Sequence, residues 1–268
     1  MYVLRHLAYV ALTGARKALV PRFWLRGVWI WLVWDAAAWL RDSIELLMSR
    51  SRQVECECCG WCGRRFFLHT YVSGTTVHRF KEEICPRCES LGRQRQLVRY
   101  LIGKLELLSS DGTMLLDIGP GKADLAWFAR RGLPGVITVD IRPGAAMLAM
   151  DITRMGFKDG VFDLIVCSHV LEHVPDDGAA LREIQRVLKP SGMCVVQVPI
   201  QPGLAETVEY SRPNPEEFDH VRAYGSNFPL RLSAAGFAIA HSENGLFEVA
   251  RKQVGCPNVD HAASGRQH

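Results

Sequence analysis

Several features that would assign a function at once are missing from this sequence. It has no uninterrupted apolar run of about 20 residues, the length that a membrane-spanning helix needs. It has no GxxxxGK[ST] pattern, so a phosphate-binding loop of that kind is not supported. The net charge of +4 over 268 residues is too small to indicate a nucleic-acid partner by itself. With 48% hydrophobic and 22% charged residues, the chain has the composition of a globular protein with one substantial domain plus attachments.

The N-terminal region shows no convincing signal peptide. Basic residues are scattered through the first forty positions, and no small-residue cleavage site follows a clean apolar core. We therefore expect a cytoplasmic protein. Residues 1–52 are basic and contain the tryptophan-rich run Val28–Trp34. Two interpretations stay open for them: helices lying on the inner face of the membrane, or amphipathic helices packed on protein.

Six of the nine cysteines lie between positions 56 and 88. The odd total and the CxxC spacings favour metal ligation in a reducing compartment over a disulfide framework. Two CxxC pairs supply four thiolates, which match the tetrahedral coordination of a structural Zn²⁺. The predicted ligands are Cys59, Cys62, Cys85 and Cys88.

The choice among these cysteines is not unique, because Cys56 and Cys59 also have the CxxC spacing, and Cys58 stands between them. Gly63 follows Cys62 and suits the tight turn of a zinc knuckle, which favours Cys62 as a ligand. Buried or redox-active thiols are the alternative. Residues 65–83 alternate in polarity and predict two short strands around a turn at 73–74. We therefore expect residues 53–90 to form a zinc-ribbon-like module.

A strand, a tight turn and a helix are predicted over Thr113–Arg131. An apolar run ends at Asp117 and is followed by Gly119 and Gly121, where the backbone can turn sharply and a ligand can approach closely. The turn leads into a helix N-terminus, which favours polar or anionic ligand groups. A dinucleotide fingerprint would place a third glycine at Asp124, so a nicotinamide or flavin cofactor is weakly supported.

Strand-like and helix-like segments alternate after this turn, as in a doubly wound α/β sheet. Before the turn, residues 90–108 predict a linking helix. The irregular segment 201–224 precedes the last predicted helix. The expected later helices are 176–188 and 226–235, and the expected strands are 114–117, 135–140, 147–150, 162–167, 193–198, 237–241 and 246–250.

The series from Met114 to Pro199 resembles the small-molecule, type 11-like branch of class I S-adenosylmethionine-dependent methyltransferases. The quoted motifs are DIGPG, VDI, DIT, FDLIVCSHVLEHV and RVLKPSG; one departure is Ala123, where the family often has a third glycine. The resemblance implies a Rossmann-like, seven-stranded doubly wound sheet that binds S-adenosylmethionine, with Asp140 accepting the ribose hydroxyls. The implied cofactor residues are Asp117, Gly119, Gly121, Asp140, Ile141, Asp151, Ile152 and Ser168.

The resemblance further implies a methyltransferase domain over residues 91–252, followed by a disordered tail, 253–268. Enzymes that methylate exocyclic amines of bases carry [DN]PP[YF] where this chain has Ser168-His169-Val170, so nucleic acid is disfavoured. We expect a small-molecule, saccharide or lipid-linked acceptor. The alternatives are an RNA or protein methyltransferase guided by the zinc module, and a non-catalytic scaffold that retains the fold.

Two histidines are candidates for a general base. His169 follows the fourth strand, and His220 lies in segment 201–224, which resembles the family's substrate-side lid. For each, a structural hydrogen bond is an equal alternative. Arg222 is expected either to hold an anionic group of the substrate or to pair with Glu216 or Glu217.

Overall fold

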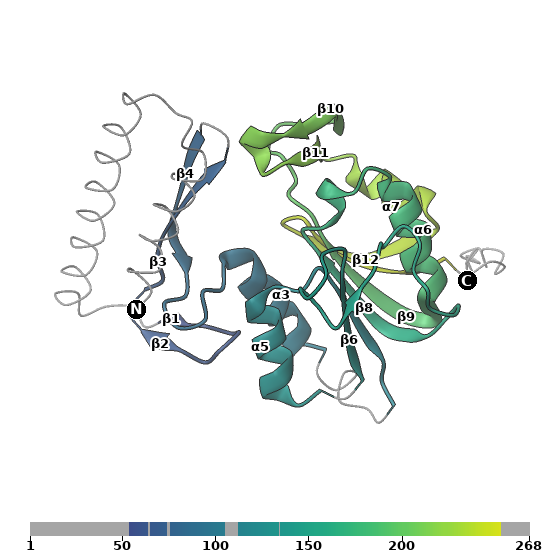
Figure 1. Cartoon of the computed structure of the whole chain (residues 1–268), viewed down its shortest axis with the longest axis horizontal. Helices are drawn as coiled ribbons and strands as arrows, with labels where there is room; N and C mark the ends of the chain where they lie inside the picture. Colours follow the sequence, from purple (N-terminus) through teal and green to yellow (C-terminus); the bar gives the residue numbers. More distant parts are fainter. Residues whose placement is uncertain (1–53, 64, 74–75, 105–111, 134, 253–268) are drawn as a thin grey trace, which may run out of the picture. The chain divides into compact units, whose positions relative to one another are not determined.

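The computed structural model describes residues 54–63, 65–73, 76–104, 112–133 and 135–252 (Figure 1). The predictions made for residues 1–52 and for the tail 253–268 lie outside these residues and stay predictions. Within the described part, no helix is long and apolar enough to cross a bilayer. The chain divides into two compact units, which are described separately. The first takes in the described residues of Met1–Ser109, Pro120–Leu133 and Asn214–His220, and the second those of Ser110–Gly119, Pro134–Pro213 and Val221–His268.

The first unit contains two small sheets and two helices. β1 pairs antiparallel with β2, and β3 pairs antiparallel with β4, which confirms the two strands predicted between the CxxC pairs. The η2 turn also belongs to this unit. Its elements are β1 (Val54–Glu55), β2 (Cys62–Gly63), β3 (Phe67–Ser73), β4 (Thr76–Ile84), α3 (Gly92–Ile102), α5 (Lys122–Arg131) and η2 (Pro215–Glu217).

Helices α3 and α5 each bury an apolar stripe. Leu97 and Leu101 of α3 are fully buried, at the four-residue spacing that places side chains on one helix face. Trp127 of α5 is fully buried as well. Helix α5 ends at Gly132, whose left-handed backbone (φ +60°) is the usual way for a helix to stop.

The second unit is built on a seven-stranded sheet of order β12-β13-β9-β8-β5-β6-β7. The five strands from β9 to β7 run parallel, and β13 is antiparallel to both β9 and β12. This arrangement confirms the predicted Rossmann-like class I methyltransferase fold. The strands are β5 (Leu115–Ile118), β6 (Val136–Asp140), β7 (Leu148–Ala149), β8 (Phe162–Ser168), β9 (Leu188–Gln197), β12 (Phe237–Glu243) and β13 (Leu246–Arg251).

Helices α6 (Asp177–Val187) and α7 (Phe228–Ala234) belong to the same unit. Asp176 caps α6 by accepting a hydrogen bond from the Ala179 N–H at 2.8 Å. The helix expected over 176–188 ends at Val187, and β9 begins directly after it at Leu188, five residues before the strand expected to start at 193. A Cβ on Gly192 would lie 3.0 Å from the Phe162 carbonyl oxygen, so glycine lets β9 pass close to β8.

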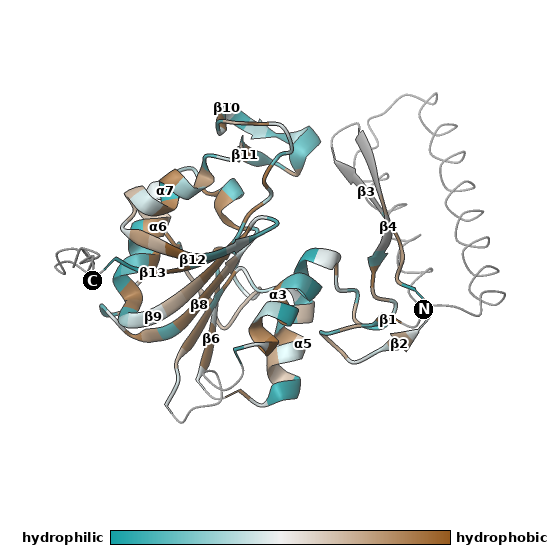
Figure 2. Cartoon of the chain, turned by 180° about the vertical axis from the view of Figure 1, so that it is seen from behind, coloured by the Kyte–Doolittle hydropathy of each residue, from teal (hydrophilic) through white to brown (hydrophobic). Residues whose placement is uncertain are grey.

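The core of this unit is formed by its central strands and by α6 and α7. The segments Leu164–Cys167 of β8 and Met193–Val196 of β9 are continuously apolar and buried, as expected for parallel strands covered on both faces, and Figure 2 shows the hydrophobic residues of the central strands. Fully buried core side chains include Phe162, Ile165, Cys194, Val196, Leu181, Ile184, Phe228 and Leu232.

Segment 201–224 was predicted as irregular, but it is ordered into a two-stranded sheet of β10 (Val208–Asn214) and β11 (His220–Ala223). Arg222 of β11 is only 3% exposed. Its guanidinium donates to the carbonyl oxygens of Leu171 at 2.8 Å, Val174 at 2.5 Å and Pro175 at 2.8 Å. The arginine therefore ties β11 to the segment that follows β8.

Two carboxylates neutralise this buried cation. Glu209 of β10 accepts from Arg222 at 2.9 Å and also pairs with Arg231 of α7. Asp177, at the start of α6, accepts from the Tyr224 hydroxyl at 2.8 Å and from Arg231 at 2.9 Å. The partners expected for Arg222, Glu216 or Glu217, were therefore wrong. The Nε, Nη1 and Nη2 atoms of Arg222 all donate to acceptors within the protein, so its described contacts are structural.

We predict that Arg222→Met lowers the free energy of unfolding by about 3–5 kcal/mol, because three carbonyls and a carboxylate lose their buried partner. Urea denaturation of the full chain measures this loss. Arg212→Met, at an exposed arginine of β10, is the matched control and should change stability by less than about 0.5 kcal/mol. Equal midpoints for the two variants would contradict a structural role for Arg222.

Candidate functional site

The carboxyl ends of β5, β6 and β8 meet at one edge of the sheet. Ile118 of β5 is in register with Val139 of β6 and with Cys167 of β8. The predicted residues Asp140 and Ser168 each come one position later, so they stand at the same level on either side of β5. The chain passes from β5 to β6 on one side and returns through β8 on the other, which makes this edge the switch point of the sheet. Ligands of open α/β sheets bind at such points.

Gly119 forms the turn at the end of β5, and two constraints require a glycine there. Its φ of +66° is a left-handed conformation, and its N–H donates to the Val139 carbonyl at 2.8 Å. A Cβ at this position would lie 2.5 Å from Cγ2 of Val170, in the loop after β8. Asp117, one residue inside the end of the strand, is only 2% exposed.

Asp140 ends β6 with a carboxylate that is 6% exposed. Its Oδ1 accepts from the Arg142 N–H at 2.8 Å and from Arg142 Nε at 3.0 Å, and its Oδ2 accepts from Arg142 Nη2 at 2.8 Å. These hydrogen bonds lower the pKa of Asp140, despite the opposing effect of burial. Asp140 is therefore an ionised acceptor, and its main partner is a guanidinium that is 76% exposed.

Apolar side chains lie exposed beside this carboxylate. Ile141 is 70% exposed and Met147 is 68% exposed, which is unusual for large hydrophobic residues in a folded chain. Asp151 is exposed, and its Oδ1 accepts from the Thr153 N–H and hydroxyl, both at 2.8 Å. Ile152, in contrast, is 6% exposed and belongs to the core. Ile141, directly after Asp140 in the chain, offers an exposed apolar surface on which a flat aromatic ring could pack.

His169 follows β8 in a strained backbone conformation. Its φ is +54°, uncommon outside glycine, and its N–H donates to the Gln197 carbonyl at 2.8 Å. Its Nδ1 lies 3.1 Å from Oε1 of Glu172, which is 1% exposed. Burial raises the pKa of Glu172, but the hydrogen bond and charge of His169 outweigh it and the pKa is lowered. The preceding residue, Ser168, donates its hydroxyl to Gln197 Oε1 at 2.8 Å.

The remaining predicted residues, Gly121 and His220, belong to the first unit. Gly121 is the N-cap of α5 with φ −80°, a conformation that any residue adopts. His220 begins β11, is partly buried, and has its ring centroid 5.8 Å from that of Phe218. A catalytic role for His220 stays a prediction.

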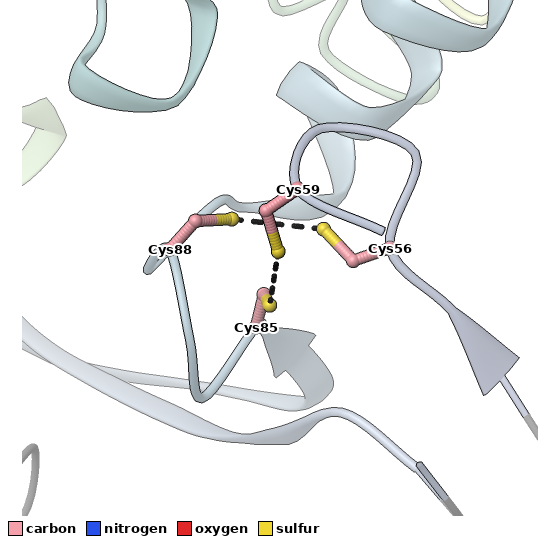
Figure 3. Close-up of side chains that lie close together, drawn as sticks. All are labelled: Cys56, Cys59, Cys85 and Cys88. Atoms are coloured by element: carbon pink, nitrogen blue, oxygen red, sulfur yellow. Dashed lines mark hydrogen bonds between the residues drawn. The ribbon is translucent and has the colours of Figure 1, made fainter. Parts of the chain in front are cut away.

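Four cysteines of the first unit converge on one point (Figure 3). The cluster consists of Cys56, Cys59, Cys85 and Cys88, whose sulfur atoms all lie within 4.8 Å of one another. We call it the thiol cluster. The Cys56 and Cys88 sulfurs are 3.6 Å apart, and those of Cys59 and Cys85 are 3.7 Å apart. These distances are too long for disulfides and close to the separation of about 3.8 Å that tetrahedral Zn–S bonds of about 2.3 Å impose.

The predicted ligand Cys62 is not part of the thiol cluster; Cys56 takes its place. Cys62 is exposed and belongs to β2, where it pairs with Glu55 of β1. Its sulfur lies 3.8 Å from the Gly60 carbonyl oxygen. The tight turn is formed instead by the preceding CxxC pair, Cys56 and Cys59. There the Gly60 N–H donates to the Cys56 carbonyl at 2.7 Å, and Gly60 has φ +68°. Gly60 follows Cys59 as Gly63 follows Cys62, so the glycine signal was present at both pairs.

A family model described as a methyltransferase domain matches residues 116–196. The matched residues run from β5 into β9 of the second unit. Demethylmenaquinone methyltransferase of Mycolicibacterium vanbaalenii is 33% identical over 114 residues, 40% of this chain and 50% of the relative. Sterol 4-C-methyltransferase of Caenorhabditis elegans is 29% identical over 150 residues, 48% of this chain and 42% of the relative. The chain thus spans about half the length of these curated relatives.

Among solved structures, the chain is similar to 1,6-didemethyltoxoflavin-N1-methyltransferase of Burkholderia thailandensis with bound 1,6-didemethyltoxoflavin and S-adenosylhomocysteine. The sequence identity is 17% and the TM-score is 0.45, over 70% of this chain and 100% of that one. The residues matched by the family model include both strand-end residues Asp117 and Asp140, together with Gly119 and the loop after β8.

We predict that Asp140→Asn weakens S-adenosylmethionine binding at least tenfold, because an amide offers one acceptor oxygen where the ribose needs two. Titration calorimetry on the full chain measures the affinity. Asp159→Asn is the control, because Asp159 precedes β8 and so lies at the opposite edge of the sheet. An unchanged affinity of the Asp140 variant would show that this carboxylate does not hold the ribose.

Proposed function

We propose that this chain is an S-adenosylmethionine-dependent methyltransferase that acts on a small-molecule, saccharide or lipid-linked acceptor. One observation supports it most: the residues that match the methyltransferase family model bring a glycine turn and a strand-end carboxylate, Gly119 and Asp140, to the switch point of the sheet. The names of the relatives, a demethylmenaquinone and a sterol methyltransferase, favour an apolar or lipid-linked acceptor.

The strand-end residues have the chemistry that an adenosyl cofactor requires. Gly119 gives the tight left-handed turn at the end of β5, packed against Val170, and Asp140 is an ionised acceptor. In this structure Arg142 uses three of the four lone pairs of Asp140. The ribose hydroxyls would replace the exposed guanidinium, while the backbone N–H of Arg142 keeps the carboxylate oriented. Ile141 would pack against the adenine.

S-adenosylmethionine, when bound, supplies an electrophilic methyl group, so this chain has to bind and orient the acceptor. Orientation alone contributes up to about 7–11 kcal/mol to lowering such a barrier. For an acceptor that must lose a proton, His169 is the proposed base. The ionised Glu172 accepts from Nδ1–H of His169, which leaves Nε2 unprotonated and able to take a proton.

The proposed function is tested directly by incubating the full chain with methyl-labelled S-adenosylmethionine and a panel of quinol, sterol, glycolipid and RNA acceptors. Transfer of label to one of the first three classes is the expected result. Transfer to RNA alone, lost steeply with rising salt as phosphate contacts require, would overturn the choice of acceptor. Absence of cofactor binding by calorimetry would support a scaffold without catalysis.

We predict that His169→Gln lowers kcat about a hundredfold or more at neutral pH and removes the limb of the pH profile that reports the base. His173→Gln is the matched control, because His173 is exposed and lies in the same turn. Cofactor affinity should be unchanged in both variants. A pH profile of the His169 variant that parallels that of the wild type would exclude His169 as the base.

We also propose that the thiol cluster holds a structural Zn²⁺. Four thiolates close a tetrahedral site and leave no position for a substrate, which distinguishes a structural from a catalytic zinc. Both sulfur–sulfur separations, 3.6 and 3.7 Å, fit such a site. This metal would cross-link two segments that are about 30 residues apart in the chain.

Metal analysis of the purified full chain should give about one Zn²⁺ per molecule. We predict that Cys56→Ser lowers this content substantially, because three thiolates hold zinc less tightly than four. Cys62→Ser should retain the wild-type content, since Cys62 lies outside the thiol cluster. The reverse order of the two variants would refute the proposed ligand set.

A further inference from the structure

Helix α5 begins with a buried carboxylate that holds the second glycine of the turn. Asp124 is 7% exposed, and its Oδ2 accepts from the Gly121 N–H at 3.0 Å. Burial raises the pKa of Asp124 to about 6, against the opposing effect of this hydrogen bond. Its Oδ1 accepts no hydrogen bond from any residue that the structure describes. A half-satisfied buried carboxylate is costly, which calls for a functional reason.

Gln94 of α3 reaches this carboxylate from the neighbouring helix. Its Oε1 accepts from the Leu91 N–H at 3.0 Å, which caps α3, and its Nε2 lies 3.4 Å from Asp124 Oδ2. A Cβ on Gly121 would lie 2.2 Å from Gln94 Nε2 and 2.7 Å from Asp124 Oδ2. Since the φ of Gly121 suits any residue, close contact with the Gln94 and Asp124 side chains, rather than the backbone, favours glycine there.

The start of α3 is built into the thiol cluster. Ser90 is fully buried, and its Oγ lies 3.3 Å from the Cys56 sulfur and 3.2 Å from the Cys88 sulfur. The Ser90 carbonyl accepts from the Cys85 N–H at 3.0 Å and from Arg95 Nη1 at 2.7 Å. The second CxxC turn and the first turn of α3 are thus one hydrogen-bonded structure.

The other CxxC turn contacts the far ends of both helices. Glu57 pairs through its carboxylate with Arg99 of α3 at 2.9 Å, and its carbonyl accepts from Arg130 of α5 at 3.1 Å. A Cβ on Gly60 would lie 2.7 Å from Arg130 Nη1, so the turn and α5 are in close contact. All these residues lie within the first unit.

We propose that Gln94 and Asp124 are positioning residues for the Gly121 peptide, and that the metal-bound thiol cluster sets their geometry, so that cofactor binding is coupled to metal binding. This rests on the proposed function, in which the turn that contains Gly121 contacts the cofactor. Without metal, the cross-link between the two CxxC turns is lost. Helices α3 and α5 then lose their common support.

Thermodynamic linkage makes the coupling reciprocal. If zinc raises the affinity for S-adenosylmethionine by some factor, S-adenosylmethionine raises the affinity for zinc by the same factor. Couplings of this kind are typically about fivefold or more. A purely structural zinc that does not affect the turn would show a factor of one while the protein stays folded.

The test uses calorimetry of S-adenosylmethionine binding to the full chain, with zinc content and thermal melting measured on the same samples. Gln94→Ala should keep a full complement of zinc and bind S-adenosylmethionine about fivefold or more weakly. Gln96→Ala is the matched control, because it lies two residues further on and on the other side of α3. Gln94→Glu, which places a second carboxylate beside Asp124, should weaken binding further.

Titration with a competing zinc chelator, with and without S-adenosylmethionine, measures the reciprocal effect. When the cofactor is present, a higher chelator concentration should be needed to remove the zinc. Wild-type affinity in both Gln94 variants, or equal zinc affinity with and without cofactor, would overturn the coupling while leaving the proposed function intact. Zinc-loaded wild-type protein that binds no S-adenosylmethionine would remove both proposals. A Gln94 variant that melts early is replaced by Asp124→Asn, with the same expected result.

Discussion

The parallel register of β5, β6 and β8 is the constraint on which the candidate site depends. Because Ile118, Val139 and Cys167 stand side by side, the residues that follow them emerge at one edge of the sheet. A slip of one residue in either pairing would move one strand-end residue about 3.3 Å along its strand and turn its side chain to the opposite face of the sheet. The packing of these strands in the core therefore fixes the relative positions of the residues at the site.

Buried polar groups then hold the loops above this edge. His169 is restrained by Glu172 and by the Gln197 carbonyl, and the following segment is restrained by Arg222. Glu172 and Arg222 are removed from water, and the partners of Arg222 lie on other elements of the second unit. Such networks favour one loop arrangement strongly, because any other arrangement leaves a buried charge without its hydrogen bonds.

The thiol cluster gives the first unit a similar organisation around a different centre. Its two sheets have few residues and little apolar surface of their own, and small modules of this kind commonly need a metal or disulfides for stability. Here the cluster also reaches helices α3 and α5 through Ser90, Glu57 and Arg95. Through these contacts the thiol cluster can influence the N-terminus of α5, which directly follows the glycine turn.

The sequence alone determined the order of strands and helices, the glycine turn and the strand-end acids. These follow from local rules: apolar periodicity, the backbone freedom of Gly119, and the position of Asp140 directly after an apolar run. It did not reveal the true partners of Arg222 or the ordered strands of segment 201–224, because those depend on contacts between residues far apart in the chain.

The thiol cluster shows the same division most clearly. Local spacing limited the zinc ligands to a few CxxC pairs, but two overlapping pairs, Cys56 with Cys59 and Cys59 with Cys62, are each followed by a glycine. Only the pairing of β1 with β2, which draws Cys62 into a strand, decided for Cys56. Spacing along a chain constrains which side chains can share a turn, whereas the convergence of two distant turns on one point is a property of the folded backbone.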